Sequence, residues 1–356
     1  MKSSPVDLKL FDFQLDKNKI ALEPVSPRDH SRLLVLDKNY SDLNFYDLPS
    51  FLDAGDTLVL NETKVIPSYF ECIRKRADKS SKIKLNLIKE LEDGSWLILV
   101  KPKKRVRIND KIIFSATDEI EAIVLAFEED DHVKISFNLD KEKLIKWIFV
   151  NGTMPLPPYI MSQRDIKKED ELDYQTVYAR THGSAAAPTA GLHFTENLIE
   201  EIKSKGVNIC TVILHVGSGT FSPIKTNDIL DHKIHSEWCC LGADQVKILN
   251  QTKENKNKIV AVGTTSMRIL ETAVNMEGVF SEYIGETDIY ITPGFKFNAV
   301  DILVTNFHLP RSSLFVLVCA FYGIQNMQKA YRYAIKNNYR FYSYGDACLI
   351  KKNYDI

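Results

Sequence analysis

The segment 258–274 reads KIVAVGTTSMRILETAV, and it joins an apolar strand directly to a helix. Residues 259–262 are all apolar, which is typical of a strand buried on both faces of a sheet. Gly263 and the hydroxyl residues after it mark a turn, and apolar residues then recur at helical spacing. The segment therefore predicts a strand–turn–helix unit, the building block of an α/β domain.

The same alternation of strand and helix continues over most of the chain. Further strands are predicted at 32–37, 56–61, 211–216, 288–293 and 301–306. Further helices are predicted at 141–149, 196–205, 243–251, 311–323 and 326–338. We therefore expect a mixed sheet flanked by helices.

One block breaks this pattern. Between 68 and 140, six short stretches of β-type sequence follow one another with no helix between them, at 69–74, 82–90, 95–102, 110–116, 119–128 and 132–139. Several alternate strictly between apolar and polar residues, as in KIKLNL at 82–87. The expected organisation is thus an α/β domain built from 1–67 and 141–356, with an all-β, barrel-like domain inserted at 68–140.

Composition limits the classes of partner. The 356 residues are 44% hydrophobic, and the formal net charge is −1, so a nucleic acid would have to be held by a local basic patch. The inserted block supplies such a patch in KPKKRVR and in the earlier Arg74-Lys75-Arg76. The candidates for nucleic-acid contact are Lys101, Lys103, Lys104, Arg105 and Arg107. A solvated strand edge protected by lysines is the alternative, and both interpretations stay open.

The sequence shows neither a clear targeting segment nor a disulfide pattern. The six cysteines show no CxxC spacing, so we expect reduced, mostly buried thiols. The first residues lack an apolar signal-peptide core, and the longest apolar run, LFVLVCAFY at 314–322, is too short to cross a bilayer. These features predict a cytoplasmic protein without membrane contact.

Three histidines stand between apolar neighbours. His193, His215 and His308 lie in LHF, LHV and FHL, each at a predicted junction between a strand and a loop. A single such histidine is more often a hydrogen-bonded core residue. Three at strand ends favour a site, because ligands of open α/β sheets bind beyond the carboxyl ends of the strands.

A fourth cluster is DHKIHSE at 231–237, which contains His232, His235 and Glu237. Imidazole and carboxylate ligands suit zinc or iron, yet no HExxH motif or cysteine pair accompanies them. General acid–base catalysis is the better use of these groups, and no metal site is predicted.

Anion binding is expected where strands meet helices. Thr264 and Thr265 begin a predicted helix, whose free N–H groups and hydroxyls favour anions. Arg268 and Arg311 lie close to such starts and suit a carboxylate or phosphate. A surface or structural role is the alternative for either arginine.

Ten stretches together resemble a known family. They are IALEPVSPRDHSRLLVLD, GDTLVLNETKVIP, MPLPPYI, DYQTVYA, SAAAPTAGLHFT, LHVGSGTF, HKIHSE, VGTTSMRILE, TNFHLPRSSL and YRFYSYGDACLI, in this order. The chain is similar to the S-adenosylmethionine:tRNA ribosyltransferase-isomerases of bacterial queuosine biosynthesis, almost end to end. It departs from that pattern at ADKSSKIKLNLI in the insert, and at Ser313 and Cys348, where threonine and methionine are expected.

The resemblance implies a reaction. The ribosyl part of S-adenosylmethionine, a co-substrate, is transferred to 7-aminomethyl-7-deazaguanine at the wobble position of tRNAs with GUN anticodons. The product is epoxyqueuosine, and adenine and methionine are released. No other cofactor is implied.

This chemistry needs several proton transfers, from the ribose 5′ carbon, to adenine and from the amine, which suits several histidines in one cleft. On this basis His215, His193 and His308, with His232, His235 and Glu237, are the acid–base candidates. Arg268 or Arg311 would hold the methionine carboxylate, and Asp288 or Glu271 would read the guanine-like edge. Tyr344, in an aromatic stretch that resembles a last strand, would stack on a base or else be core.

Two other classes compete with this interpretation. One is a metal-dependent hydrolase that uses His232, His235 and Glu237. The other is a non-catalytic RNA-binding module built on the basic insert.

Overall fold

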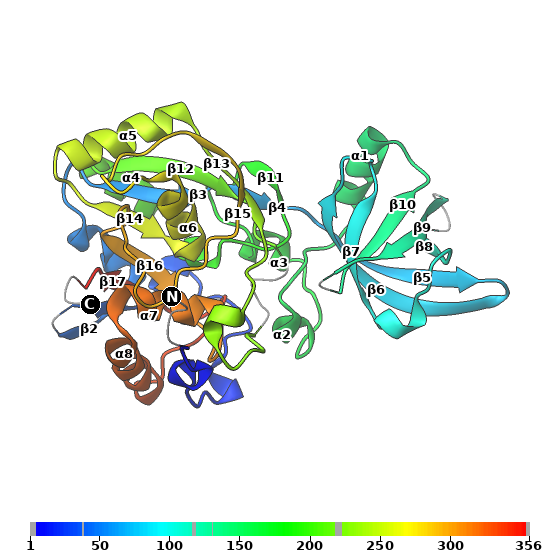
Figure 1. The fold of residues 1–356 in the computed structure, drawn as a ribbon, viewed down its shortest axis with the longest axis horizontal. Helices are drawn as coiled ribbons and strands as arrows, with labels where there is room; N and C mark the ends of the chain where they lie inside the picture. The colour runs from blue at the N-terminus through cyan, green and yellow to red at the C-terminus, as the bar shows by residue number, and fades with distance from the viewer. Residues whose placement is uncertain (1–4, 38, 116–118, 130, 218–222, 354–356) are drawn as a thin grey trace.

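The protein consists of two lobes, one built on a nine-stranded sheet and one on a closed barrel (Figure 1). This is a computed structural model, and it describes residues 5–37, 39–115, 119–129, 131–217 and 223–353. The predicted fold class, a mixed sheet flanked by helices with an inserted β-barrel, is confirmed.

The large sheet has the strand order β15-β13-β12-β3-β14-β16-β17-β1-β2. Its strands are β1 (Arg32–Leu36), β2 (Tyr40–Asn44), β3 (Thr57–Asn61), β12 (Asn208–Leu214), β13 (Glu237–Leu241), β14 (Ile259–Val262), β15 (Tyr283–Thr287), β16 (Ile302–Asn306) and β17 (Ala347–Lys351). β12, β3, β14 and β16 are mutually parallel, so their carboxyl ends meet at one edge of the sheet. A two-stranded sheet of β4 (Thr63–Val65) and β11 (Thr181–Ser184) lies between the lobes (Figure 1).

Helices cover both faces of this sheet because successive strand residues point to opposite sides. In β3, Val59 packs into one core cluster, whereas Leu58 and Leu60 pack into another. The first cluster includes residues of α5 (Ala243–Glu254), α6 (Gly263–Ala273), α7 (Ser313–Tyr322) and α8 (Ile324–Lys336). The second is closed by α4 (Glu196–Ser204) and the 3-10 helix Phe45–Phe51.

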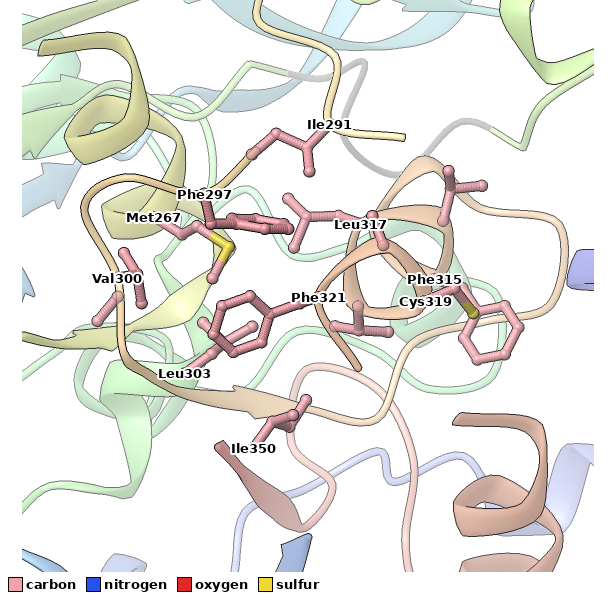
Figure 2. Packing of buried hydrophobic residues seen from close by; sticks show 14 of the residues in the cluster. Met267, Ile291, Phe297, Val300, Leu303, Phe315, Leu317, Cys319, Phe321 and Ile350 are labelled. Carbon is pink, nitrogen blue, oxygen red and sulfur yellow. The ribbon is translucent and has the colours of Figure 1, made fainter. Parts of the chain in front are cut away.

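The core beneath α7 lies next to the site described below. Phe321 and Phe297 meet edge to face with ring centroids 4.9 Å apart, between Leu303 of the sheet and Met267 of α6 (Figure 2). Leu317 of α7 lies in the same layer (Figure 2) and lines one of the cavities described below. α7 is apolar around most of its circumference, as expected for a buried helix.

The barrel closes in the order β10-β7-β6-β5-β8-β9. Its strands are β5 (Tyr69–Arg76), β6 (Lys79–Glu90), β7 (Trp96–Lys101), β8 (Lys111–Ser115), β9 (Ile120–Phe127) and β10 (Val133–Phe137), which matches the six stretches predicted from sequence. All neighbouring pairs are antiparallel, so closure removes the exposed strand edges.

Helix α1 (Lys141–Asn151) packs against the barrel rather than the large sheet. Leu144 and Ile148 belong to the barrel core, and the Trp147 ring stacks on Phe70 with centroids 5.4 Å apart. The two connections between the lobes are joined by paired backbone hydrogen bonds between Tyr69 and Thr153. Judged by its packing contacts, the chain returns to the α/β lobe near Thr153. The boundary expected from sequence was at 141.

Two expected strands are wrong. Residues 288–293 are not a strand, because the chain leaves the sheet after Thr287, the last residue of β15. The aromatic stretch 339–346 is a loop before β17, and Tyr342 has a positive φ of 75°, which is incompatible with a strand. Among the described residues, the remaining helices are the short α2 (Pro158–Met161) and α3 (Asp170–Asp173) and 3-10 turns at Leu8–Phe11, Lys17–Lys19, Arg28–His30, Lys103–Arg105, Thr189–His193 and Ile229–Asp231.

The six cysteines are free thiols, and five of them are buried. In the part of the chain that the structure describes, no helix is both long and apolar enough to span a membrane.

Candidate active site

Two cavities of about 480 and 490 Å³ adjoin at the carboxyl edge of the large sheet. Leu314, in the first turn of α7, lines both of them. We call them the ion-pair cavity and the hydroxyl cavity. The ion-pair cavity is lined by His232, Ile234, His235, Glu237, Arg268, Ile289, Tyr290, Ile291, Ser313, Leu314 and Leu317. The hydroxyl cavity is lined by Ala187, Pro188, Thr189, Ala190, Val216, Gly263, Thr264, Thr265, Thr305, Asn306, His308, Leu314, Tyr342 and Ser343.

A buried ion pair defines the first cavity. Arg268, from α6, donates to a carboxylate oxygen of Glu237, the first residue of β13. The other carboxylate oxygen accepts a 2.7 Å bond from the Gly217 N–H, so Glu237 also holds the loop that follows β12. Arg268 donates further to the Thr287 carbonyl at 3.3 Å. Both side chains are more than nine-tenths buried, so this pair orients Arg268 in a site of low polarity.

Two histidines share that cavity. His232 lies 5.8 Å from the Tyr290 ring, edge to face, and His235 lines the same space. Burial, and then the nearby His235, lowers the pKa of His232 below its usual value. A lowered pKa keeps an imidazole neutral at pH 7, which is the form that accepts a proton.

The N-terminus of α6 opens into the hydroxyl cavity. Gly263 takes a positive φ of 87° there, which lets the chain turn from β14 into the helix. Thr264 and Thr265 follow in the first turn, and both are buried. The Thr265 hydroxyl has no hydrogen-bond partner among the described residues. Free N–H groups and this hydroxyl together suit an acceptor or an anion.

His308 lines the same cavity beyond β16. Its Nε2 lies 3.0 Å from the Thr305 hydroxyl, and its backbone N–H donates to the Tyr331 hydroxyl at 2.9 Å. Burial lowers the pKa of His308 to about 3. The ring is thus neutral at pH 7 and acts through hydrogen bonds rather than as an imidazolium.

His193 lies behind the hydroxyl cavity rather than in its lining. Asn306 accepts a 3.0 Å bond from the Thr189 hydroxyl, so its amide nitrogen donates to His193 Nε2 at 3.1 Å. His193 Nδ1 then donates to the Ser31 hydroxyl at 2.7 Å. Burial lowers its pKa to about 3, and its ring stacks on Phe45. With both ring nitrogens engaged, His193 holds Asn306 in place.

His215 lies outside both cavities. Its Nδ1 is 2.8 Å from the Thr63 hydroxyl of β4, and its ring stacks on Trp238 of β13 with centroids 5.0 Å apart. A Cβ on Gly183 would lie 2.5 Å from His215 Nε2, so glycine is required beside this ring. Burial lowers the pKa of His215. Residues 218–222, which continue the stretch LHVGSGTF after Gly217, lie outside the described residues.

Four other candidates line neither of the two cavities. Glu271 accepts hydrogen bonds of 2.9–3.3 Å from the N–H groups of Asn298, Ala299 and Val300, and burial raises its pKa although these bonds oppose the rise. Arg311 is half exposed and pairs with Asp12, with Nε at 2.8 Å. Both therefore have structural partners that sequence could not reveal.

Asp288 is exposed and lines neither cavity. Tyr344 is buried against Tyr174 in a separate core cluster, so its ring is closed to a stacking base.

The basic patch lies on the barrel surface. Lys103, Lys104 and Arg105 form a 3-10 turn after β7, and Lys101 and Arg107 flank it, all with exposed or half-exposed side chains. Lys103 pairs with Asp131 at 3.0 Å, and Arg105 donates to the Lys82 carbonyl at 3.2 Å. The turn is thus held in place at the surface.

Several cavity residues were absent from the predicted set, and two of them carry polar side chains at strand ends. Asn306 ends β16, and Tyr290 follows β15; both line the cavities. Asn306 stands directly after a buried strand in VTNFHL, and that position was a usable signal.

The alternative metal site has no support in the geometry. Within the described ranges, no group of three His, Cys, Asp or Glu side chains is arranged to hold a metal ion. Glu237 is instead engaged by Arg268 and Gly217.

The molecule thus combines an α/β lobe, which has two adjoining polar cavities at the carboxyl edge of its sheet, with an inserted β-barrel. The chain belongs to the family of queuosine biosynthesis proteins, whose model matches residues 8–350. It is 47% identical over 350 residues to the S-adenosylmethionine:tRNA ribosyltransferase-isomerase of Beijerinckia indica subsp. indica, covering 96% of this chain and 95% of that protein. The relative of the same name in Brucella ovis is 45% identical over 351 residues, covering 96% and 97%.

A solved structure agrees. The crystal structure of S-adenosylmethionine tRNA ribosyltransferase from Thermotoga maritima at 2.00 Å resolution is 37% identical, with a TM-score of 0.54, and covers 96% of this chain and 99% of that one. The enzyme family that the ten sequence stretches predicted is thereby confirmed.

Proposed function

We propose that this member of the family transfers the ribosyl part of S-adenosylmethionine to 7-aminomethyl-7-deazaguanine at the wobble position of tRNAs with GUN anticodons. Epoxyqueuosine forms in the tRNA, and adenine and methionine leave. S-adenosylmethionine is consumed as a co-substrate, and no further cofactor takes part. The reaction takes place in the cytoplasm, where both substrates are available.

The observation that carries this proposal is the adjacency of the two cavities. One holds a fixed cation, Arg268, beside two histidines, and the other holds hydroxyls, a helix N-terminus and a neutral histidine. S-adenosylmethionine has the matching parts: a carboxylate, an acidified ribose 5′ carbon, and an adenine that departs with negative charge.

Roles follow from these environments. Arg268, oriented by Glu237, binds the methionine carboxylate in a charge-assisted contact. His232 takes the ribose 5′ proton, because its lowered pKa keeps the imidazole neutral at pH 7, and His235 in the same cavity is the alternative base. In the hydroxyl cavity, His308 and the first turn of α6 at Thr264 and Thr265 receive the adenine and stabilise its developing charge.

The remaining histidines act less directly. His193 serves as a positioning residue through Asn306. His215 stands beside Gly217, whose N–H is held by Glu237, and serves the amine of the modified base. Arg311, Glu271, Asp288 and Tyr344 take no part in this scheme.

The test is adenine release. Purified protein is mixed with S-adenosylmethionine and tRNA that carries 7-aminomethyl-7-deazaguanine, and free adenine is followed by chromatography. We expect adenine only when the modified tRNA is present. Glu237→Gln should lower kcat/KM by about 100-fold or more, because Arg268 loses its orienting charge, whereas Glu254→Gln at the exposed end of α5 should change nothing. Absence of adenine from a folded protein that binds both substrates would refute the proposal.

A further inference from the structure

A separate groove runs between the two lobes and takes no part in the scheme above. Its empty space, which is partly open to solvent, is about 990 Å³. One wall is the outer face of the barrel at β5, β6 and β7, and the other is the connection 155–162 together with Ala185 and Ala186. The lining is mostly apolar, yet two lysines belong to it.

The register of the barrel strands places the residues on the barrel side of the groove next to one another. Lys84 pairs with Lys101, Asn86 pairs with Leu99, and Tyr69 pairs with Asn86. Because alternate strand residues share a face, these five side chains lie together on the outside of the barrel. The Lys84 side chain is 61% exposed, and its partner Glu71 is 67% exposed at 2.9 Å. An exposed pair of this kind contributes little free energy, so Lys84 remains available to another anion.

The opposite wall is apolar and rigid. Pro157 and Pro158 restrict the backbone, and Met161 of α2 adds a polarisable side chain. Ala186 forms a bridge with Val216, which lines the hydroxyl cavity. One end of the groove is therefore next to the candidate active site, and Lys101 links the groove to the basic turn at Lys103–Arg105.

We propose that this groove binds an unpaired nucleotide of the substrate RNA, adjacent to the nucleotide that is modified. The inference rests on the proposed function, since it takes a tRNA anticodon loop as the ligand. Phosphates contact Lys84 and Lys101, and the base lies on the Tyr69 ring between Leu99 and the prolines. An unpaired nucleotide combines a charged backbone with an apolar base face. The groove offers lysines to the backbone and apolar side chains to the base.

The basic turn favours RNA over a peptide or a second copy of this chain. Lys101, Lys103, Lys104, Arg105 and Arg107 continue the positive charge from the mouth of the groove along the barrel. A row of cations that leads away from a base-sized apolar pocket fits a polyanion that passes through the groove.

The first test measures the salt dependence of binding to an RNA hairpin with the sequence of an anticodon stem and loop. Lys84→Ala/Lys101→Ala is compared with Lys203→Ala/Lys247→Ala, which removes the same charge from helices outside the groove. For two lost phosphate contacts on a single strand, the slope of log K against log salt should fall by about 1.4 in magnitude. The control pair should keep the wild-type slope.

The second test locates the base. A hairpin with 2-aminopurine next to the wobble position should lose fluorescence on binding wild-type protein, because the base stacks, and Tyr69→Leu should abolish that loss. If the wild type binds the hairpin tightly and Lys84→Ala/Lys101→Ala keeps the wild-type slope, the proposal that the groove binds RNA is overturned. Adenine release by the wild type would be intact in that case. A wild-type dimer in which a second copy fills the groove would overturn the proposal as well.

Failure of the proposed function would look different. In that case the wild type releases no adenine, yet the lysine effect on hairpin binding persists.

Discussion

Single residues with the same sequence surroundings have different environments here. His193, His215 and His308 all lie between apolar neighbours, yet only His308 lines a cavity. His193 has both ring nitrogens in hydrogen bonds, and the half-buried His215 stacks on Trp238 beside Gly183. The difference lies in distant partners, such as Ser31 and Asn306 for His193, which local sequence does not encode.

The low pKa of His193 predicts a pH dependence of stability. Its folded pKa is about 3, below the unfolded value of about 6.5. Below pH 6.5 the unfolded chain binds a proton that the folded chain does not, so this residue lowers the free energy of unfolding as pH falls toward 3. Above pH 6.5 the neutral His193 makes its full contribution to the free energy of unfolding, and this contribution no longer changes with pH.

We therefore expect that His193→Asn, although less stable at pH 7, loses less stability between pH 6 and 4.5. The wild-type slope should exceed the variant slope by about 1.4 kcal/mol per pH unit at most. Urea titrations at each pH measure this difference, and His30→Asn, at an exposed histidine, is the control. Equal slopes for wild type and His193→Asn would contradict a neutral, buried His193.

At the scale of elements, helix α6 organises the site. Its N-terminus opens into the hydroxyl cavity, Arg268 in its middle reaches the ion-pair cavity, and Glu271 near its end holds the loop before β16. These three functions lie on one helix because it is buried along its whole length against the parallel strands. Glu271 resembles a site residue in sequence, yet its carboxylate serves the fold.

Glu271 should therefore matter for stability rather than for substrate choice. Removing the carboxylate leaves the N–H groups at 298–300 without an acceptor in a buried loop. We expect Glu271→Ala to lower the free energy of unfolding by about 2–4 kcal/mol, and Glu271→Gln to lower it less. Urea unfolding measures this, with the exposed Glu277→Gln as the control. A loss below about 0.5 kcal/mol would contradict the assigned anchoring role.

At the scale of the whole molecule, the inserted barrel contributes a local cluster of basic residues rather than a net charge. The chain is close to neutral overall, and the barrel carries the basic turn beside the inter-lobe groove. Because the barrel has its own closed core, changes on its surface leave the catalytic sheet intact. We therefore expect that mutations can weaken RNA binding without impairing catalysis.

Neutralising the basic turn tests that separation. Lys103→Ala/Lys104→Ala/Arg105→Ala should weaken tRNA binding and reduce the salt slope of log K by about 2 in magnitude. Circular dichroism should stay unchanged. A control that removes three exposed lysines from the other lobe, Lys203, Lys247 and Lys329, should bind as wild type does. An unchanged slope would remove the turn from the RNA interface.

The amino-acid sequence by itself determined the elements, the insertion of a barrel and the family. Periodicity sufficed for β3, β14, α6 and the barrel strands, because burial of alternating or helical apolar faces is a local requirement. It failed at 288–293, where an apolar run packs beside a cavity rather than in the sheet. It also assigned the helix at 141–149 to the α/β domain, whereas α1 packs on the barrel core, because an apolar stripe does not specify which core it will join.

Only the tertiary structure decided which polar side chains form the site. Arg268 is paired with Glu237, 31 positions away, whereas Arg311 is paired with Asp12 at a separation of 299. Charge pairing depends on distance in space and on burial, and neither can be inferred from the residues next to each arginine in the sequence. For that reason two arginines in similar sequence settings became an oriented cation in a buried cavity and a surface ion pair.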